Sequence, residues 1–399
     1  MRVALAVDPW GFPFSGVAVS SRRFVQALAG RGFEFSVLCA QGGDGPAGGV
    51  EQVRFPWLFL PGLNGIIRRM RAPMAWPVRS ILRSVMDRAD VLNVQLPTPL
   101  GLMALQQARA VGVPVVCSFH VQPENVLANL GISNRHLAEK LYRLSVEHVY
   151  NRADVVVAPS PFAAELLRRH GLSAPVQVIS NGVPESFFVA PVRHSDGRFR
   201  VLSVGRLARE KRQETLIRAV HRNARRGRID LQFVGVGPER RRLERLARRL
   251  AVSAVFEAVD ERTLIKRYRA ADLFVHTGVV ELEGMSVLEA MASANTVVVA
   301  DSKHAASTGF STRPETFFQV DDAVDLSRKI DFWLDRDNER LKQGRENQRL
   351  ARRFLHRLAA EALAGVYRDV APRRASHELA LQASQGMEQA GSRRNRQRC

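Results

Sequence analysis

Two glutamates eight positions apart, Glu281 and Glu289, are the side chains of this sequence best placed to do chemistry. The segment Glu281–Glu289 reads E-L-E-G-M-S-V-L-E, follows an apolar run typical of a buried strand, and opens a helical pattern. A helix N-terminus offers free N–H groups and the positive end of a dipole to an anion, and Gly284 lets a ligand approach the backbone. The carboxylates could bind hydroxyls on either side of a phosphate, or they could simply complement the helix dipole.

Two cations, Arg206 and Lys211, follow another strand-like run, Phe199–Val204. A diphosphate leaving group gains charge as its bond to a sugar breaks, and fixed cations stabilise that charge. A bidentate guanidinium and a compact ammonium suit its two phosphates. The alternative is a solvated basic start of a helix.

A histidine and a glycine follow strands of the first half. His120 lies in the segment Ser118–Asn125, S-F-H-V-Q-P-E-N, directly after a strand that ends at Cys117. Ligands of open α/β sheets bind beyond the carboxyl ends of strands, so His120 is expected to face a ligand, although a lone histidine is often structural. Gly16 lies in the loop Phe12–Val17 between the first strand and the first helix.

The elements that must position these residues alternate between strand and helix, which predicts an α/β fold with doubly wound parallel sheets. The pattern restarts after a polar segment, Pro191–Gly197. We therefore expect a first domain over residues 1–190, a second over 191–370 that includes the C-terminal helices, and a disordered basic tail over 371–399. Strands are predicted at 3–7, 35–38, 91–94, 113–117, 155–158, 176–179, 199–204, 231–234, 254–257, 273–276 and 296–300. Helices are predicted at 17–30, 100–111, 136–151, 161–170, 210–226, 238–251, 260–270, 285–294 and within 325–370.

Taken together, these motifs resemble glycosyltransferase family 4, of the GT-B fold. They are similar to its Glu-x7-Glu, G-R-x-x-x-x-K and F-H-x-Q-P-E-N segments, and closest to the branch that glycosylates diacylglycerol and related lipids. The resemblance implies two Rossmann-like domains that face each other across a cleft. The family usually has a glycine after the helix that carries the second glutamate of the motif, and this chain has Ala294 at that place.

The resemblance also implies roles for the residues above. Glu281 would bind hydroxyls of the donor sugar and Glu289 the ribose of the nucleotide. The other residues expected at the donor site either lie near the diphosphate or the sugar or form the start of the motif helix. They are Gly16, His120, Arg206, Lys211, Gly284, Met285 and Ser286. We expect His120, Arg206, Lys211 and Glu281 to act in catalysis.

The expected reaction is transfer of a hexose from a UDP- or GDP-sugar with retention of configuration, as the resemblance implies. Because cations already cover the diphosphate, no metal and no cofactor are expected. Asp335-Arg336-Asp337 has the D-x-D spacing of metal-dependent glycosyltransferases, but it lies late in a helical region, so we interpret it as surface charge.

Charge and composition point to an anionic partner. The net charge is +20, and segment 55–82 mixes Trp57 and Trp76 with Arg68, Arg69, Arg71 and Arg79, a composition typical of a segment on an anionic bilayer. No run of about 18 apolar residues predicts a membrane span, and three scattered cysteines indicate a reducing compartment. We expect a bacterial enzyme, cytoplasmic and peripheral on the inner face of the cell membrane, with a lipid acceptor. A soluble or polysaccharide acceptor is the alternative.

Two other classes of protein have partial signals. Gly235-Val236-Gly237 could begin a dinucleotide fingerprint, which would indicate an NAD-dependent dehydrogenase, but Arg240 replaces the third glycine. The basic charge and the Arg-rich segment Glu239–Arg249 would suit nucleic acid, but no helix-turn-helix, zinc or RNP motif accompanies them, so no nucleic-acid partner is expected.

Overall fold

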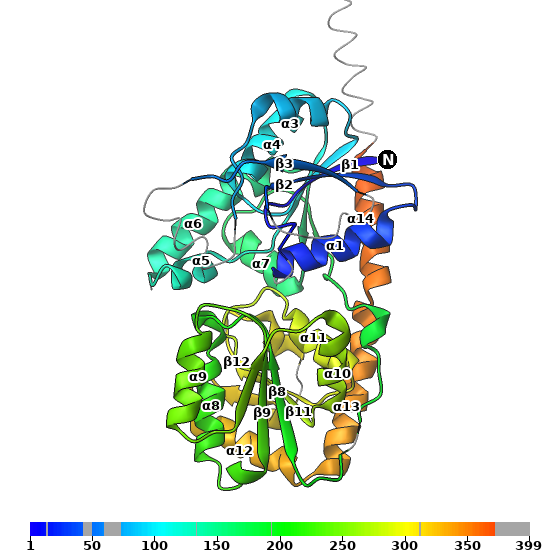
Figure 1. The fold of residues 1–399 in the computed structure, drawn as a ribbon. Coiled ribbons are helices and arrows are strands. Elements are labelled where there is room, and N and C mark those ends of the chain that lie inside the picture. Colours follow the sequence, from blue (N-terminus) through cyan, green and yellow to red (C-terminus); the bar gives the residue numbers. More distant parts are fainter. Residues whose placement is uncertain are drawn as a thin grey trace, which may run out of the picture.

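The computed structural model describes residues 1–12, 15–42, 50–59, 73–132, 134–192, 194–310 and 313–371. Two parallel sheets, each flanked by helices, form two domains one above the other in Figure 1. The first sheet has seven strands in the order β3-β2-β1-β4-β5-β6-β7, and the second has six in the order β10-β9-β8-β11-β12-β13. The predicted pair of doubly wound, Rossmann-like domains is confirmed.

The first domain follows the predicted alternation of strands and helices. Buried strands covered on both faces read as largely apolar runs, which is why β6 and, despite its Asn93, β4 were predictable. Ser15, Thr98 and Ser160 cap the helices α1, α4 and α7 with their side-chain oxygens. The elements are β1 Arg2–Ala6, α1 Gly16–Leu28, β2 Glu34–Ala40, β3 Glu51–Phe55, α3 Arg79–Met86, β4 Val91–Val94, α4 Pro99–Ala110, β5 Val115–Ser118, α5 Pro123–Asn129, α6 Arg135–His148, β6 Val155–Ala158, α7 Pro161–Arg169 and β7 Val176–Val178.

The second domain repeats the architecture with its own buried core. Asp260 and Asp322 cap α10 and α12. The elements are β8 Phe199–Val204, the 3-10 turn η3 Arg209–Lys211, α8 Gln213–Arg222, β9 Ile229–Val234, α9 Arg240–Arg249, β10 Ala254–Glu257, α10 Glu261–Ala270, β11 Leu273–His276, α11 Met285–Ala292, β12 Val297–Asp301, β13 Phe317–Gln319, α12 Ala323–Leu334, α13 Asp337–Ala351 and α14 His356–Val370.

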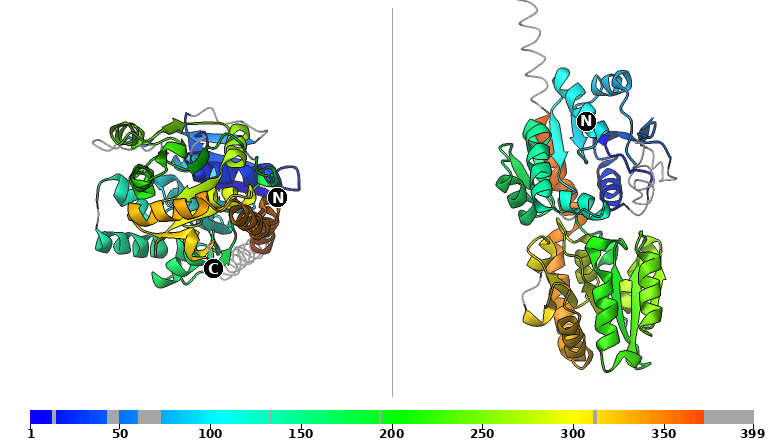
Figure 2. Two further views of the ribbon diagram at one scale, coloured as in Figure 1. Left: turned by 90° about the horizontal axis from the view of Figure 1, so that it is seen from below. Right: turned by 90° about the vertical axis from the view of Figure 1, so that its left-hand side faces the viewer.

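The last helix, α14, packs on the first domain. The sequence pattern had assigned it to the second domain, which was expected to run to residue 370. The buried residues Ala360, Leu363 and Tyr367 of α14 share a core cluster with Val3 of β1. Figures 1 and 2 show α14 on the first domain, and in Figure 1 it lies beside α1, although the two helices are far apart in the sequence. The sequence pattern predicted helix within residues 325–370, but it could not show which domain receives the apolar face of the last helix.

Two further expectations concern the backbone at Ala294 and the length of apolar helices. Ala294, where the resemblance places glycine, has φ 56°, in the left-handed region. An alanine there costs about 1 kcal/mol more than a glycine. No helix among the described residues is long and apolar enough to cross a membrane.

Candidate functional site

The loops that follow the strands of the two sheets meet at the domain boundary. Leu282, after β11, inserts its side chain into the core of the first domain, and its carbonyl accepts a hydrogen bond from Ser160, after β6. Gln122, after β5, donates to the carbonyl of His304, after β12, at 3.3 Å. The carboxyl ends of both sheets therefore face each other, as ligand sites of open α/β sheets require.

The segment Glu281–Glu289 forms the entry to α11, as predicted. Gly284 precedes the helix with φ 92°, a left-handed conformation. A Cβ atom at Gly284 would lie 3.0 Å from Cβ of Ser307, so both the backbone and the space favour glycine. Met285 and Ser286 form the half-buried first turn of α11, whose N–H groups are the expected anion site.

Glu281 lies in a compact charged cluster with Lys211 and His276. Lys211 Nζ donates to Glu281 Oε1, and His276 Nε2 lies 3.1 Å from the same oxygen. Burial opposes ionisation of Glu281, but Lys211 and His276 outweigh it and hold its pKa to about 2. Glu281 is therefore ionised at neutral pH. Its main partner, Lys211, is one of the two cations expected to bind the diphosphate.

Arg206 lies on the same edge of the second sheet, in the loop after β8, which pairs with β11. The side chain is half-buried, and burial lowers the pKa of Arg206 below its ordinary value, although Glu210 opposes the shift. A partly desolvated guanidinium interacts more strongly with an arriving anion than an exposed one does.

The G-x-G turn after β9 has a packing explanation. A Cβ at Gly235 would lie 2.0 Å from the carbonyl oxygen of Gly205, and a Cβ at Gly237 would lie 2.1 Å from that of Leu207. These glycines therefore let the β9 loop press against the loop that carries Arg206. They do not need a dinucleotide to account for them.

Glu289, the second glutamate of the motif, is buried on α11. Its Oε2 accepts from the Tyr268 hydroxyl at 3.1 Å, and its Oε1 lies 3.2 Å from Nη1 of Arg23, which comes from α1 of the first domain. Burial raises the pKa of Glu289, although Arg23 and Tyr268 oppose the rise.

Glu283, between the two motif glutamates, joins the interdomain linker. It accepts hydrogen bonds from Ser180 Oγ, from the backbone N–H of Asn181 at 3.1 Å and from Asn181 Nδ2 at 2.6 Å. Burial raises the pKa of Glu283 to about 7 despite these donors. The middle glutamate thus fixes the motif loop to the chain segment that connects the domains.

In the first domain, His120 lies two residues before Gln122, which reaches His304 of the second domain, and Gly16 lies on α1, whose Arg23 reaches Glu289. His120 Nε2 is 2.9 Å from Gln95 Oε1, and burial lowers the pKa of His120 to about 4. Gly16 begins α1, and a Cβ built there would meet no atom within 4 Å. Neither backbone strain nor crowding by the chain itself requires glycine at this helix start.

The structure joins two of the predicted residues directly and adds four residues that the sequence did not single out. Glu281 and Lys211 are in contact, whereas Glu289 faces a different partner from the first domain. The additional polar residues are Arg23, Gln95, His276 and Glu283. His276 ends a predicted strand five residues before Glu281, which was a usable signal; the partners of Arg23 and Gln95 are far away in sequence.

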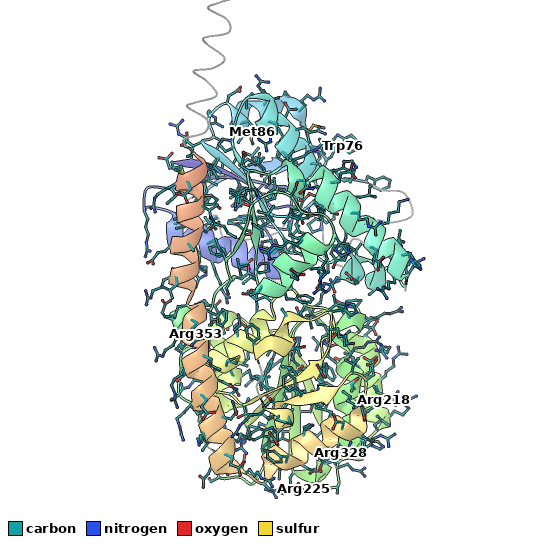
Figure 3. The ribbon with its side chains drawn as sticks, turned by 180° about the vertical axis from the view of Figure 1, so that it is seen from behind. Trp76, Met86, Arg218, Arg225, Arg328 and Arg353 are labelled. Atoms are coloured by element: carbon teal, nitrogen blue, oxygen red, sulfur yellow. The ribbon has the colours of Figure 1, made fainter. Side chains whose placement is uncertain are left out.

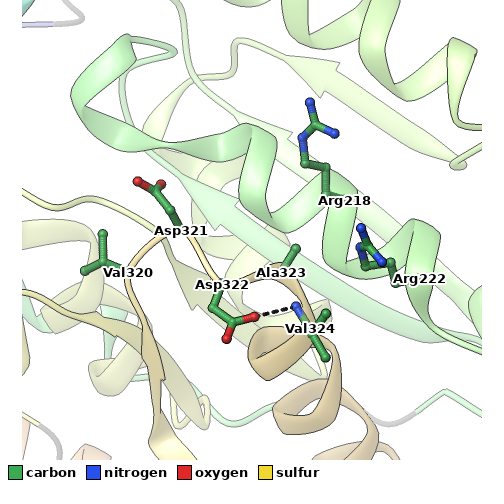
Figure 4. A pocket seen from close by; sticks show the side chains of 7 residues that line it. All are labelled: Arg218, Arg222, Val320, Asp321, Asp322, Ala323 and Val324. Carbon is green, nitrogen blue, oxygen red and sulfur yellow. Dashed lines mark hydrogen bonds between the residues drawn. The ribbon is translucent and has the colours of Figure 1, made fainter.

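The described part of the chain offers no metal site, and the D-x-D segment and a surface depression both lie apart from the candidate site. Among the described residues, no group of three or more His, Cys, Asp or Glu could hold a metal ion. In the D-x-D sequence, Asp335 pairs with Arg225, and Asp337 accepts from Arg340 at 2.7 Å. A shallow depression of about 460 Å³ lies between α8 and the start of α12 (Figure 4), and none of its lining residues is a predicted site residue: Arg218, Arg222, Val320, Asp321, Asp322, Ala323 and Val324.

Comparison with family models matches both halves of the chain. The model of Glycosyltransferase Family 4 matches residues 14–187, and that of Glycosyl transferases group 1 matches residues 186–350. The two matches meet at residues 186–187, shortly after Asn181, to which Glu283 is hydrogen-bonded.

Three curated proteins are similar in sequence. A GDP-mannose-dependent alpha-mannosyltransferase of Mycolicibacterium smegmatis is 30% identical over 76% of this chain and 80% of its own length. A sulfoquinovosyl transferase, SQD2, of Arabidopsis thaliana is 27% identical over 75% of this chain and 59% of its own. An alpha-monoglucosyldiacylglycerol synthase of Streptococcus pneumoniae is 25% identical over 52% of this chain and 51% of its own.

Solved structures share the fold at low sequence identity. Sucrose-phosphate synthase from Thermosynechococcus elongatus superposes with a TM-score of 0.75 at 18% identity, over 92% of this chain and 98% of the other. Anabaena Alr3699/HepE in complex with UDP and glucose gives a TM-score of 0.72 at 17% identity, over 92% and 99%. These likenesses concern the two-domain architecture.

Proposed function

Since the chain belongs to glycosyltransferase family 4, we propose that it transfers a hexose from a UDP- or GDP-sugar, with retention and without a metal, to a hydroxyl group of a membrane lipid. The single observation that carries the donor part is the cluster of Lys211, Glu281 and His276 beside the N-terminus of α11. It combines an anion site with a carboxylate that stays ionised. A sugar diphosphate needs both: cations for its phosphates and acceptors for its hydroxyls.

Lys211 has a defined task in this proposal. In the structure its ammonium neutralises Glu281. A diphosphate placed at the start of α11 would share that ammonium, and Glu281 would then turn its free lone pairs to hydroxyls of the sugar. Arg206 adds a second cation on the same sheet edge. As the bond between the anomeric carbon and the diphosphate breaks, both cations stabilise the charge that develops on the leaving oxygen.

The proton of the acceptor also needs a destination. We assign it to the departing phosphate: the acceptor oxygen attacks the anomeric carbon from the face that the diphosphate leaves, and a phosphate oxygen takes the hydroxyl proton. The anomeric configuration is then retained, and the protein contributes position and charge. The alpha-named relatives support retention, because an alpha product from an alpha-linked sugar nucleotide keeps the configuration.

The acceptor part is supported by an exposed aromatic surface on the first domain. Trp57, Phe59 and Trp76 are 39%, 74% and 57% exposed, and a bridge between Trp57 and Ala75 brings their two segments side by side. Figure 3 shows Trp76 on the first domain. The diacylglycerol in the name of the pneumococcal relative and the net charge of +20 also favour a lipid on an anionic, cytoplasmic membrane face. Arg68, Arg69 and Arg71 lie outside the described residues.

The test is a screen of UDP- and GDP-sugars for release of the nucleotide diphosphate, with and without EDTA. We expect turnover with one donor class, unchanged by EDTA. Arg206→Ala and Lys211→Ala should each lose about 2–4 kcal/mol of transition-state stabilisation. Lys342→Ala, at an exposed position on α13, is the matched control and should keep full activity. Activity that EDTA abolishes and magnesium or manganese restores would contradict the metal-independent mechanism.

A further inference from the structure

A series of buried polar side chains leads from the last helix to His120. Asn93 Nδ2 donates to the hydroxyl of Tyr367 on α14 at 2.6 Å, and Gln95 Nε2 donates to Asn93 Oδ1 at 2.9 Å. Gln95 Oε1 then lies 2.9 Å from His120 Nε2. Asn93, Gln95 and Tyr367 are at most 5% exposed, so their polar atoms depend on partners within the protein.

Two buried serines occupy the remaining positions around the Gln95 amide. Ser21 Oγ, on α1, donates to Gln95 Oε1 at 3.2 Å. Gln95 Nε2 also donates to Ser118 Oγ, at the end of β5, at 3.2 Å. The amide nitrogen has two hydrogens, and Asn93 and Ser118 take both. In this hydrogen-bond arrangement the carbonyl oxygen of Gln95, which only accepts, faces His120.

This orientation decides which imidazole nitrogen carries the hydrogen. Because Gln95 Oε1 only accepts, Nε2 of His120 must donate to it. In a neutral ring the other nitrogen, Nδ1, is then a hydrogen-bond acceptor. Burial lowers the pKa of His120 to about 4, which keeps the ring neutral at neutral pH.

We propose that Gln95 is a positioning residue, which holds His120 as the Nε2–H tautomer so that Nδ1 accepts a hydrogen bond from a hydroxyl group of the bound sugar or acceptor. The inference rests on the proposed function, which brings a substrate hydroxyl to His120. With the other tautomer, an Nδ1–H group would favour an oxygen without a hydrogen, such as a phosphate or ring oxygen. Gln95 thus selects a hydroxyl as the partner of the histidine.

The tautomer can be measured without a substrate. Long-range 1H–15N spectra of protein labelled with 15N-histidine distinguish Nε2–H from Nδ1–H rings, and His120→Gln identifies the signal. At about pH 7 we expect the Nε2–H form in the wild-type protein and a mixture of both forms in Gln95→Leu. An Nδ1–H ring in the wild-type protein would overturn the proposal.

Kinetics test whether the tautomer matters to turnover. Gln95→Leu should lower kcat about tenfold or more, with the KM for the sugar nucleotide unchanged. The matched control is Gln107→Leu, which removes another buried glutamine of the first domain. Equal kcat values for Gln95→Leu and this control would refute the positioning role. A wild-type protein without transferase activity would instead refute the proposed function, and the tautomer spectrum would then decide the structural part alone.

Discussion

Arg23 of α1 forms a buried ion pair with Glu289 of α11 across the domain boundary, with Nη1 3.2 Å from Oε1. The two side chains are 10% and 9% exposed. Arg23 also reaches Glu261, which is 50% exposed, at 2.8 Å, and its guanidinium lies over the ring of Phe187. The glutamate expected to bind the ribose is thus held by a cation of the opposite domain.

Removing Arg23 should destabilise the protein because it leaves a buried carboxylate without a cation. We expect Arg23→Met, which keeps the apolar stem over Phe187, to cost about 3–5 kcal/mol. Adding Glu289→Gln should recover much of this loss, since a neutral amide needs no counter-charge. Urea unfolding of the two single variants and the double variant gives the coupling energy.

The control for this cycle is Glu261→Gln, which removes the half-exposed partner of Arg23. Solvent screens that pair, so its loss should cost no more than about 1 kcal/mol. If Arg23→Met were as mild as Glu261→Gln, the interdomain pair would not be a stabilising contact.

The two outer motif glutamates should differ in their kinetic effects. Glu281→Gln leaves Lys211 without its partner and removes the charged acceptor for the sugar, so kcat should fall about 10²-fold. Glu289→Gln should mainly raise the KM for the sugar nucleotide, about tenfold, as expected for a lost charged hydrogen bond. Steady-state kinetics on both variants checks this, with circular dichroism to verify folding. Equal changes in both parameters would contradict separate roles in sugar and ribose binding.

The sequence could predict the sheets and the motif loops, but not the contacts between domains. The apolar runs of β4 and β6 match their predicted bounds, since strands buried on both faces leave a clear local signal. The edge strand β3, E-Q-V-R-F, has little apolar character and was missed. The place of α14 depended on which surface covers its apolar face, and no local pattern carries that information.

The same limit applies to the candidate site. Glu281 and Lys211 are 70 positions apart in sequence, yet each stood in a recognisable motif, and the structure places them in contact. Gln95 and Arg23 stood in no motif. Their importance comes from partners such as His120 and Glu289, which only the folded chain brings near.

The middle motif glutamate should make stability depend on pH. Burial raises the pKa of Glu283 to about 7, whereas in the unfolded chain a glutamate titrates near 4.3. The folded state therefore holds a proton that the unfolded state releases, so this group's contribution to stability falls as pH rises from about 4.3 to about 7. Above that range the contribution stays low.

Glu283→Gln removes this titration while keeping the shape of the side chain. Relative to the wild-type protein, the variant should gain up to about 3 kcal/mol of unfolding free energy between pH 5 and pH 8. Urea unfolding at both pH values gives the difference between the proteins, which cancels the titration of other groups such as Asp8, whose pKa burial raises to about 6. A constant difference between the two proteins across this range would show that Glu283 is ionised throughout.

The exposed aromatics of the first domain should bind a membrane surface. Trp57, Phe59 and Trp76 expose apolar surface within segment 55–82. The ring centroid of Trp57 lies 6.3 Å from that of Phe12, in the loop before α1. A bilayer that receives these rings would therefore bring its lipids close to the loop that leads into α1 at Gly16. The net charge of +20 adds attraction to anionic headgroups, at about 1 kcal/mol for each basic residue near the surface.

Co-sedimentation with vesicles measures this binding. The bound fraction should rise with the share of anionic lipid and fall with added salt, and replacing Trp57, Phe59 and Trp76 with Ser should reduce it at every salt concentration. The matched control replaces three exposed valines of the second domain, Val255, Val320 and Val324, with Ser, and should bind like the wild-type protein. A soluble or polysaccharide acceptor requires no such surface. If the wild-type protein stayed in the supernatant with anionic vesicles at low salt, the lipid acceptor would be refuted, whereas the donor site at Lys211 and Glu281 would be unaffected.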